Sequence, residues 1–446
     1  MNILVLNGSP KGENSITLQT LRYLEKKYKL THMEVLHVGQ RIKSLEKNFA
    51  PVLEAVAKAD LLVFSYPVYT FIAPCQLHRF IELMKAHGAD VTGKIATQVT
   101  TSKHFYDITA HRYIQDNVQE MGMDFIRGLS ADMEDLTTEK GRTEAEKWWE
   151  HLLWSAEQKY FEPYFPIETG SSVPATALEE TAEDKPGDVV IIADLKPEDT
   201  RLAAMISRFR ARLPYATRVV NLREYPFKGG CLGCFRCAAT GKCIYTDGFD
   251  DFLRSKIQTA DSMIYAFTIQ DHSMGSLFKM YDDRQFCNGH RTVTIGMPVG
   301  YLISGNYSKE TNLQTILEGR AQVGSNILAG IATDERDTDA AIDRLAASLA
   351  YSLEHKNTGP QNFLGIGGMK IFRDLIWQMR GFMRADHKFF KSHGQYDFPQ
   401  KKWPQSMAMY LVGAMIANPG LMSKMGNKMN EGMLMPYKKV LDDMDK

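Results

Sequence analysis

Long hydrophobic runs, net charge and scattered cysteines are the features that this sequence lacks. No apolar run reaches the roughly 18 residues of a membrane-spanning helix, and the N-terminus has no secretory signal pattern. Lysine plus arginine and aspartate plus glutamate both number 53, so the composition does not indicate nucleic-acid binding. Only six cysteines occur, and four lie between residues 231 and 243, which indicates a metal or redox site rather than a disulfide framework. We therefore expect a cytoplasmic protein with no transmembrane segment and no nucleic-acid partner.

The length and composition are typical of a folded protein with more than one domain. At roughly 150 residues per domain, 446 residues predict two or three domains. Hydrophobic residues make up 44% of the chain and charged residues 24%, which is enough apolar material for a sizeable core.

The stretch 2–17 has the pattern of a strand, a polar loop and the start of a helix. Its apolar residues 3–6 are typical of a strand buried on both faces of a parallel sheet, and turn residues follow them. The free N–H groups and the dipole of the next helix favour an anion. Side chains that add hydroxyl donors or positive charge here are Ser9, Lys11, Ser15 and Thr17. The glycine fingerprints of dinucleotide and nucleoside-triphosphate loops are absent, so we interpret the loop as a flavin phosphate site.

The same loop resembles the first loop of the NADPH-dependent FMN reductases and iron–sulfur flavoproteins, which share a flavodoxin-like fold. Gly8-Ser9-Pro10-Lys11 and Asn14-Ser15 match the pattern of that family. The resemblance implies an FMN-binding domain in the first part of the chain. An ordinary strand-to-helix loop without a ligand is the alternative.

Two further loops follow buried strands, at the edge of the sheet where ligands bind in open parallel sheets. The first, 66–71, has Pro67 to stiffen it and aromatic side chains to cover a flat ring, and the resembled family packs a similar loop on the isoalloxazine ring. The second, 100–106, is again polar and aromatic, and its His104 is either a proton donor or a surface histidine. The helix after the first loop lacks the Lys-x-Phe-x-Asp-Arg ending of the family. The predicted FMN contacts are Ser9, Lys11, Asn14, Ser15, Ile16, Thr17, Pro67, Val68, Tyr69, Thr70, Phe71, Thr100, Thr101, Ser102 and Tyr106.

The second half of the chain repeats the first. Residues 59–69 match 260–270, and residues 119–135 match 321–337, in the same order and with the same predicted elements. We therefore expect an α/β protein with two tandem flavodoxin-like, doubly wound parallel-sheet domains and a helical C-terminal extension. The expected division is 1–161 for the FMN domain, 162–187 for a linker, 188–355 for the second domain and 356–446 for the extension.

The two halves differ where the chemistry lies. The first loop of the second half, 194–200, carries three carboxylates that would repel a phosphate, so we expect only one FMN per chain. Only the second half contains Cys231, Cys234, Cys237 and Cys243, in the spacing C-x2-C-x2-C-x5-C. Four thiolates from one loop can ligate an iron–sulfur cluster or zinc, and the compact spacing favours a 4Fe–4S cluster. The resembled iron–sulfur flavoproteins carry a compact motif of this type at this place. Zinc, or no metal, are the alternatives.

The extension is helical, methionine-rich and more basic than acidic. Either it packs against the two domains, or it forms a contact for a redox partner or an anionic membrane surface.

The favoured function is an FMN-dependent oxidoreductase or electron-transfer flavoprotein that relays electrons between FMN and the cluster, with NAD(P)H or a ferredoxin as donor and a small molecule or protein as acceptor. A cluster-free NAD(P)H-dependent FMN or quinone reductase and a non-enzymatic electron carrier are the alternatives. In the resembled family one subunit's cluster approaches its partner's flavin. We therefore expect the two halves to pack like a fused dimer, with the cysteine loop 230–243 near the flavin loops.

Overall fold

The structure is a computed structural model that describes residues 1–30, 33–167, 170, 172–180, 184–356, 358–420 and 428–444. Parts of the expected linker (168–169, 171, 181–183) and of the expected extension (357, 421–427, 445–446) lie outside the described residues. The chain divides into two compact units, Met1–Phe389 and Phe390–Lys446. The four-part division expected from the sequence remains a prediction.

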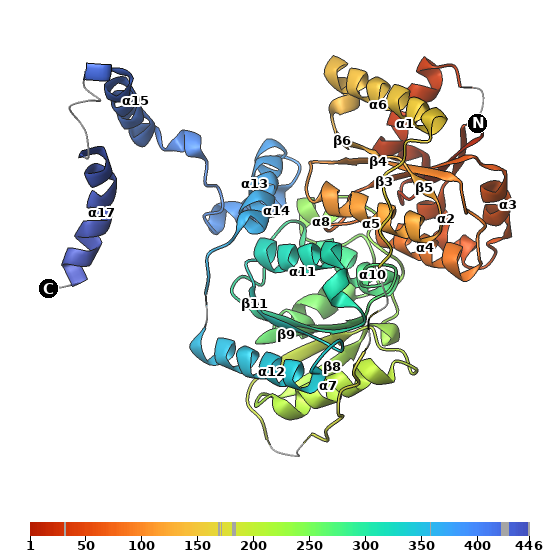
Figure 1. The fold of residues 1–446 in the computed structure, drawn as a ribbon. Coiled ribbons are helices and arrows are strands. Elements are labelled where there is room, and N and C mark those ends of the chain that lie inside the picture. Colours follow the sequence, from red (N-terminus) through yellow and green to blue (C-terminus); the bar gives the residue numbers. More distant parts are fainter. Residues whose placement is uncertain are drawn as a thin grey trace. The chain divides into compact units, whose positions relative to one another are not determined.

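The first half of the chain forms a parallel sheet with helices on both faces (Figure 1). Its strands are β1 (Ile3–Asn7), β2 (Met33–Leu36), β3 (Leu61–Pro67), β4 (Ile95–Ser102), β5 (Asp124–Phe125) and β6 (Leu129–Asp132). Its helices are α1 (Ile16–Lys27), α2 (Val38–Leu45), α3 (Ala50–Lys58), α4 (Cys75–Ala86), α5 (Asp107–Glu120) and α6 (Glu139–Gln158). The strand order is β2-β1-β3-β4-β5, with β6 also paired to β4. This is the flavodoxin order, and it confirms the fold predicted for this half.

The second half repeats this architecture. Its strands are β7 (Val189–Ala193), β8 (Thr217–Asn221), β9 (Ser262–Thr268), β10 (Pro298–Ser304) and β11 (Ile327–Thr333). Its helices are α7 (Thr200–Arg212), α8 (Arg236–Thr240), α9 (Phe249–Phe252), α10 (Ser276–Arg284), α11 (Thr311–Gly324) and α12 (Thr338–His355). The strand order is β8-β7-β9-β10-β11, again the flavodoxin order and again parallel. The tandem fold predicted from the internal repeat is therefore confirmed.

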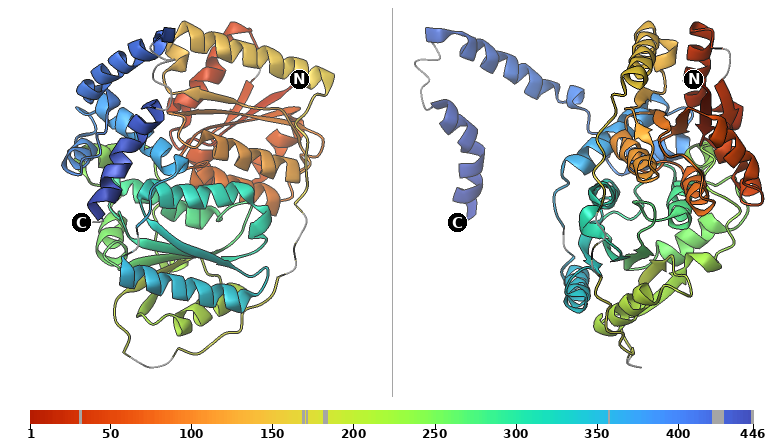
Figure 2. Two further views of the ribbon diagram at one scale, coloured as in Figure 1. Left: turned by 60° about the vertical axis from the view of Figure 1, so that its left-hand side comes forward. Right: turned by 45° about the vertical axis from the view of Figure 1, so that its right-hand side comes forward.

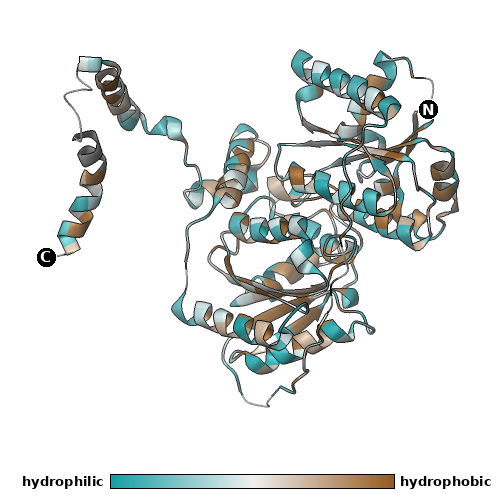
Figure 3. Cartoon of the chain, viewed as in Figure 1, coloured by the Kyte–Doolittle hydropathy of each residue, from teal (hydrophilic) through white to brown (hydrophobic). Residues whose placement is uncertain are grey.

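The apolar strands of both sheets lie between helix layers, as their brown colour in Figure 3 indicates. On the outer face of the first sheet, buried residues of β1 and β3 pack against α1 and α6. On the outer face of the second sheet, β7, β9 and β10 pack against α7 and α12. The inner faces of both sheets belong to one continuous hydrophobic cluster that also contains residues of α4, α5, α10 and α11. The two domains are thus joined through a shared core.

Equivalent helices of the two domains meet each other in this shared core. Helix α4 follows β3 and packs against α10, which follows β9; helix α5 follows β4 and packs against α11, which follows β10. These helices run through the middle of the compact unit in the views of Figure 1 and Figure 2. A surface that contacts its own equivalent is the arrangement that a twofold axis produces in a homodimer.

Strands β5 and β6 are separated by a short break. A Cβ at the intervening Gly128 would lie 2.3 Å from the carbonyl oxygen of Gln98. The chain beyond α12 begins with two helices, α13 (Phe363–Gln378) and α14 (Arg384–Ser392).

The second compact unit contains α15 (Trp403–Ala417) and α17 (Lys428–Met444). Helix α15 has no charged side chain over its 15 residues. Within the described residues, no helix has both the length and the apolar character needed to cross a membrane.

Candidate functional site

The loop after β1 is organised by a buried asparagine. The side-chain amide of Asn7 donates to the carbonyl oxygen of Gly12 at 2.9 Å, and the N–H of Ser9 donates to the side-chain oxygen of Asn7 at 3.2 Å. Ser15 caps α1, since its hydroxyl accepts from the N–H of Leu18 at 3.4 Å. The loop therefore ends at a helix N-terminus, where the first-turn N–H groups have no partner within the helix and can bind an anion.

The loop after β3 has a strained backbone that the second domain holds in place. Thr70 and Phe71 have positive φ values of 43° and 72°, which are unfavourable for residues with a side chain. The ammonium group of Lys279 donates to the carbonyl oxygen of Tyr69 at 3.0 Å, and the hydroxyl of Thr70 donates to Asp283 at 3.1 Å. Both Lys279 and Asp283 lie on α10 and are completely buried. These contacts help to offset the cost of the strained conformation.

The loop after β4 lies beside the phosphate loop. The hydroxyls of Thr17 and Thr101 are 2.6 Å apart and form a buried hydrogen bond between α1 and the end of β4. Thr101 and Ser102 are both almost fully buried. The carboxyl ends of β1, β3 and β4 thus bring three loops to one edge of the sheet, as the strand order requires.

The cysteine loop of the second domain lies directly against the loop after β3. A Cβ at Gly233 would be 1.9 Å from the Tyr69 hydroxyl oxygen, so only glycine fits at this close approach. The side-chain amide of Gln76 donates to the carbonyl oxygen of Cys231 at 3.3 Å. A Cβ at Gly230 would be 2.1 Å from the sulfur of Cys75. The loop is therefore packed on the first domain and lies on the side of the expected flavin loops.

Buried charge fixes the cysteine loop on its other side. The guanidinium group of Arg284 donates to both oxygens of Asp247 at 2.8 and 2.7 Å and to the carbonyl oxygen of Gly229 at 2.9 Å. The hydroxyl of Tyr245 donates to the carbonyl oxygen of Gly230 at 3.0 Å. Burial on its own raises the pKa of Asp247, but the bonds from Arg284 outweigh it and lower the pKa to about 2. The pair stays ionised at neutral pH.

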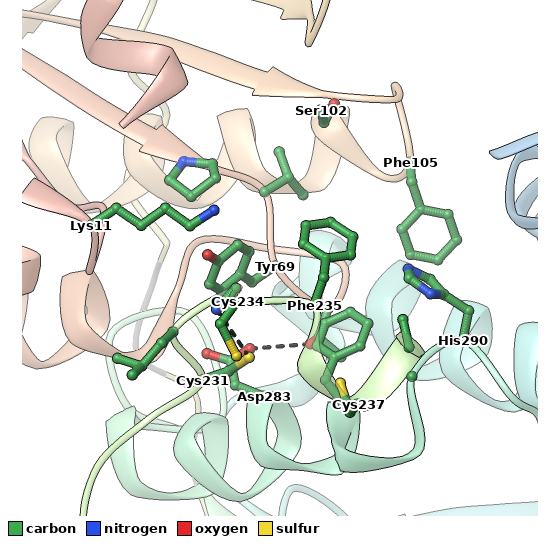
Figure 4. A pocket seen from close by; sticks show the side chains of 18 of the residues that line it. Lys11, Tyr69, Ser102, Phe105, Cys231, Cys234, Phe235, Cys237, Asp283 and His290 are labelled. Carbon is green, nitrogen blue, oxygen red and sulfur yellow. Dashed lines mark hydrogen bonds between the residues drawn. The ribbon is translucent and has the colours of Figure 1, made fainter. Parts of the chain in front are cut away.

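One cavity brings these loops together, with an empty volume of about 1360 Å³ that includes the part open to solvent. The predicted flavin residues that line it are Ser9, Lys11, Ser15, Ile16, Thr17, Pro67, Val68, Tyr69, Thr70, Thr101 and Ser102. All four cysteines of the C-x2-C-x2-C-x5-C motif line the same cavity. In Figure 4, Lys11 and Ser102 lie on one side of the cavity, and Cys231, Cys237 and Asp283 lie on the other.

Four predicted contacts do not line this cavity. Asn14 lies in an exposed turn before α1. Thr100 points to the ring nitrogen Nε2 of His111 at 2.8 Å, and Phe71 packs on Tyr106 with ring centroids 4.5 Å apart. The hydroxyl of Tyr106 donates to the carbonyl oxygen of Leu364 at the start of α13, at 3.0 Å. Phe71, Thr100 and Tyr106 thus connect the loops after β3 and β4 to their surroundings.

His104 also lies outside the cavity lining. Half of its side chain is exposed, and its Nδ1 is 2.8 Å from the carboxylate of Asp107. A surface histidine is therefore the better description of this residue.

Thiols are common metal ligands, but the four thiols of the motif do not converge on one metal position in this structure. The N–H of Gly233 lies 3.4 Å from the sulfur of Cys231, and burial raises the pKa of Cys231 well above its ordinary range and that of Cys237 to about 11. Among the described residues, no group of three or more metal-binding side chains has a coordinating arrangement. All six cysteines are free thiols.

The residues that sequence reasoning missed are Lys279, Asp283, Arg284 and His290. The first three complete a pattern that the first domain lacks, since α10 reads Lys279-x-Tyr281-x-Asp283-Arg284 and matches the Lys-x-Phe-x-Asp-Arg ending of the resembled family. The pattern is present in the second half, and α10 brings it to the loop after β3 in the first half.

Comparison with known proteins identifies the first of these domains. Residues 1–132 match the family model of the NADPH-dependent FMN reductases. No curated protein matches the chain.

Solved structures that match parts of the chain share little sequence with it. General stress protein 14 in complex with FMN from Treponema denticola is 14% identical, with a TM-score of 0.28, and the match covers 35% of this chain and 99% of that one. An NAD(P)H:quinone oxidoreductase from Methanothermobacter marburgensis is 12% identical, with a TM-score of 0.30, over 40% of this chain and 99% of that one. The flavodiiron core from Synechocystis is 11% identical, with a TM-score of 0.25, and the match covers 70% of this chain and 86% of that one.

The residues of the domain that matches the FMN reductase family fit a flavin phosphate. Its cavity-lining side chains include three hydroxyls and Lys11 near the start of α1, and none of its described lining residues is a carboxylate. The equivalent loop of the second domain contains Asp194, which pairs with Arg223 at 2.8 Å. Burial raises the pKa of Asp194, and its position beyond β7 is unfavourable for an anion.

Described residues of the expected linker contact the corresponding edge of the second domain. The N–H of Val173 donates to the carbonyl oxygen of Asp334 at 2.7 Å, and the hydroxyl of Thr338 donates back to the carbonyl oxygen of Val173 at 2.6 Å. A Cβ at Gly170 would lie 2.6 Å from the side-chain oxygen of Asn306. Gly170 and Val173 thus pack against the loops that follow β10 and β11.

Proposed function

We propose that the protein is an FMN-dependent oxidoreductase that binds one FMN in the cavity between its two domains. The observation that carries the proposal is that one cavity gathers three strand-end loops of the domain that matches the FMN reductases. When bound, FMN accepts and donates two electrons together or one at a time, which lets an enzyme connect a hydride donor to varied acceptors.

The proposed roles of the protein residues follow from their places in the cavity. Ser9, Ser15 and Thr17, together with the first-turn N–H groups of α1, bind the phosphate. The loop 67–70, held by Lys279 and Asp283, supports the flat ring. Thr101 and Ser102 form the third wall. The donor is NAD(P)H or a ferredoxin, and the free thiols fit the expected cytoplasmic location.

The flavin content of the purified protein tests this proposal. We expect yellow protein that releases one FMN per chain on acid treatment, and apoprotein that takes up one FMN again. Release of two FMN per chain, or failure of the apoprotein to bind FMN, would contradict it. Steady-state oxidation of NAD(P)H with small acceptors separates an enzyme from a non-enzymatic electron carrier.

The position of the four thiols favours a second, finer proposal. We infer that Cys231, Cys234, Cys237 and Cys243 bind a 4Fe–4S cluster beside the flavin, so that the protein relays electrons between the two groups. Support comes from the shared cavity and from the compact spacing of the motif. Binding would require these thiols to lose their protons and move together, because metal ligation needs thiolates.

Metal analysis decides between the cluster and its alternatives. Protein purified without oxygen is expected to contain about four irons and four acid-labile sulfides per chain. Replacing one cysteine by alanine should lower the iron content and leave FMN bound. Zinc without sulfide would favour a zinc site, and absence of both would favour a cluster-free NAD(P)H-dependent FMN or quinone reductase.

The second compact unit has a separate proposed role. The apolar helix α15 and the basic excess of the extension favour contact with a redox partner or an anionic membrane surface. Sedimentation of the full chain with anionic and neutral vesicles tests the membrane contact.

A further inference from the structure

A histidine–aspartate pair lies at the second-domain side of the cavity. His290 lines the cavity, and its Nδ1 is 2.9 Å from a carboxylate oxygen of Asp386. The same oxygen accepts the backbone N–H of His290 at 3.0 Å, and Arg291 donates to the other oxygen at 3.2 Å. Asp386 is fully buried and comes from α14, almost one hundred residues away in the sequence. The three bonds fix both the carboxylate and the imidazole ring.

The opposite nitrogen of this ring is free to act on a ligand. The hydrogen bonds of the described residues include none to Nε2 of His290, and Nε2 is not among the buried atoms that lack a partner. A carboxylate that accepts from Nδ1–H favours the tautomer with the proton on Nδ1, so Nε2 is the nitrogen that gains or loses a proton. In Figure 4 the ring of His290 lies beside Phe105 at one side of the cavity.

Aromatic side chains surround this end of the cavity. Phe372 of α13 stacks on Phe105 with centroids 4.4 Å apart, and it meets the ring of His290 edge to face at 4.9 Å. The ring of Phe286 lies 5.7 Å from that of His290. Three elements that are far apart in the sequence thus build an apolar slot with one polar group, the imidazole. Such a slot suits a flat aromatic ligand that carries an oxygen.

We propose that this slot is the acceptor site and that it takes a planar quinone, with His290 as the residue that protonates the quinone oxygen. The inference rests on the proposed function, because it requires FMN in the same cavity. A quinone becomes a hydroquinone by gaining two electrons and two protons. A hydride from reduced FMN brings both electrons and one proton. The second proton moves from Nε2 of protonated His290 to the oxygen, and His290 then takes a proton from water.

Asp386 is a positioning residue in this scheme. It accepts a hydrogen bond from Nδ1–H and so directs Nε2 to the cavity. Arg291 donates to the other oxygen of Asp386 at 3.2 Å and so helps to hold the carboxylate in place. Gly289 makes the approach possible, since a Cβ there would lie 2.2 Å from Asp386.

The first experiment compares two acceptors with the FMN-loaded protein. Menadione, a quinone, needs protons, whereas ferricyanide takes up electrons only. For His290→Gln we expect turnover with menadione to fall by at least about 100-fold, the usual scale for a lost general acid. Turnover with ferricyanide should stay within about twofold, because a lost general acid does not affect electron transfer alone. His151→Gln, at an exposed position of α6, is the matched control and should change neither rate.

The second experiment needs no flavin. Menadione binding to the apoprotein is measured by quenching of intrinsic fluorescence. Phe372→Ala should weaken binding by about tenfold, since an aromatic face is lost. Phe363→Ala, on the same helix but 85% exposed, should leave binding unchanged. Nitrogen-15 NMR of labelled histidine should show the Nδ1–H tautomer of His290, and Asp386→Asn should abolish that preference.

The outcomes separate this inference from the proposed function. Equal loss of menadione and ferricyanide turnover in His290→Gln would show a structural role and overturn the inference. Unchanged menadione turnover in His290→Gln would also overturn it. So would an unchanged affinity of the Phe372→Ala apoprotein for menadione. If the protein takes up no FMN, the proposed function fails, and the binding and NMR measurements still decide whether the slot exists.

Discussion

Glu82 and Asp283 each cap the helix that carries the other, across the interface of the two domains. Glu82 on α4 accepts from the N–H and the hydroxyl of Ser276 at 2.7 Å, and Asp283 on α10 accepts from the N–H of Cys75 at 2.8 Å. Cys75 and Ser276 are the first residues of α4 and α10, and the carboxylates are the eighth residues of the same helices. The exchange is reciprocal, as expected if a symmetric homodimer had become one chain.

The two capping carboxylates should contribute differently to stability. Asp283 also pairs with the completely buried Lys279, so Asp283→Asn leaves that ammonium group without its closest counter-charge. We expect this variant to lose about 3–5 kcal/mol of unfolding free energy. Glu82→Gln keeps an acceptor for Ser276 and should lose only about 1 kcal/mol. Urea denaturation of both variants measures the difference, and equal losses would show that the Lys279 charge does not depend on Asp283.

The hydroxyls near the start of α1 should determine FMN affinity. Ser15→Ala and Thr17→Val each remove a donor to the phosphate and should weaken FMN binding by about 1–3 kcal/mol. Titration of apoprotein with FMN, followed by flavin fluorescence, gives the affinity. Thr200→Val at the start of α7 is the matched control, and it should leave affinity and stoichiometry unchanged. A loss of affinity in the control would mean that the second domain also binds flavin.

Local sequence patterns were enough to predict the fold and the loops that line the cavity. Apolar runs followed by turn residues marked β1, β3 and β4, and parallel pairing places their carboxyl ends at one edge. The internal repeat predicted the second sheet. The close approach of the cysteine loop to the first domain followed from a resemblance and was not a local signal. In the structure it depends on Gly233 lying against Tyr69.

Features that depend on distant contacts were not predictable from the sequence. Tyr106 belongs to a loop after β4, but its hydroxyl bonds to the carbonyl of Leu364, more than 250 residues later. The pairing of His290 with Asp386 joins α14 to the segment after α10. Neither histidine nor aspartate stands in a motif that marks the pair. The break at Gly128 follows from the nearness of Gln98 on β4, which no pattern around residue 128 encodes.

The close approach of Gly233 to Tyr69 leads to a third prediction. Gly233 has a φ of +60° and no room for a Cβ, so Gly233→Ala adds both backbone strain and a clash. Gly241→Ala is the matched control: its φ is +78°, and the nearest atom to a Cβ is 4.0 Å away. Strain alone costs about 1–2 kcal/mol in either variant.

The clash should appear as loss of the loop from its place on the first domain. We expect proteolysis within residues 231–243, and reactivity of Cys75 toward a thiol reagent, to rise in Gly233→Ala and to stay near wild type in Gly241→Ala. Similar changes in both variants would mean that strain, and not contact with Tyr69, controls the position of the loop.

A buried histidine makes the interface sensitive to pH. Nδ1 of His272, in the second domain, is 3.0 Å from Glu310, and Nε2 is 3.5 Å from Glu120 of the first domain. Burial on its own lowers the pKa of His272, but the hydrogen bond to Glu310 and the charges of the two glutamates outweigh it and raise the pKa to about 9. The nearby imidazole of His272 is the largest cause that lowers the pKa of Glu120 to about 2.

The sign of the effect on stability follows from the raised pKa. Protonated His272 favours the folded state, so its contribution is complete below the ordinary histidine pKa of 6.5 and disappears as the pH rises through about 9. We expect His272→Gln to lower the unfolding free energy by up to about 3 kcal/mol near pH 6 and by far less near pH 10. Urea denaturation at both pH values, with His151→Gln as the control, measures this difference. An equal loss at both pH values would show that His272 acts through packing and not through its charge.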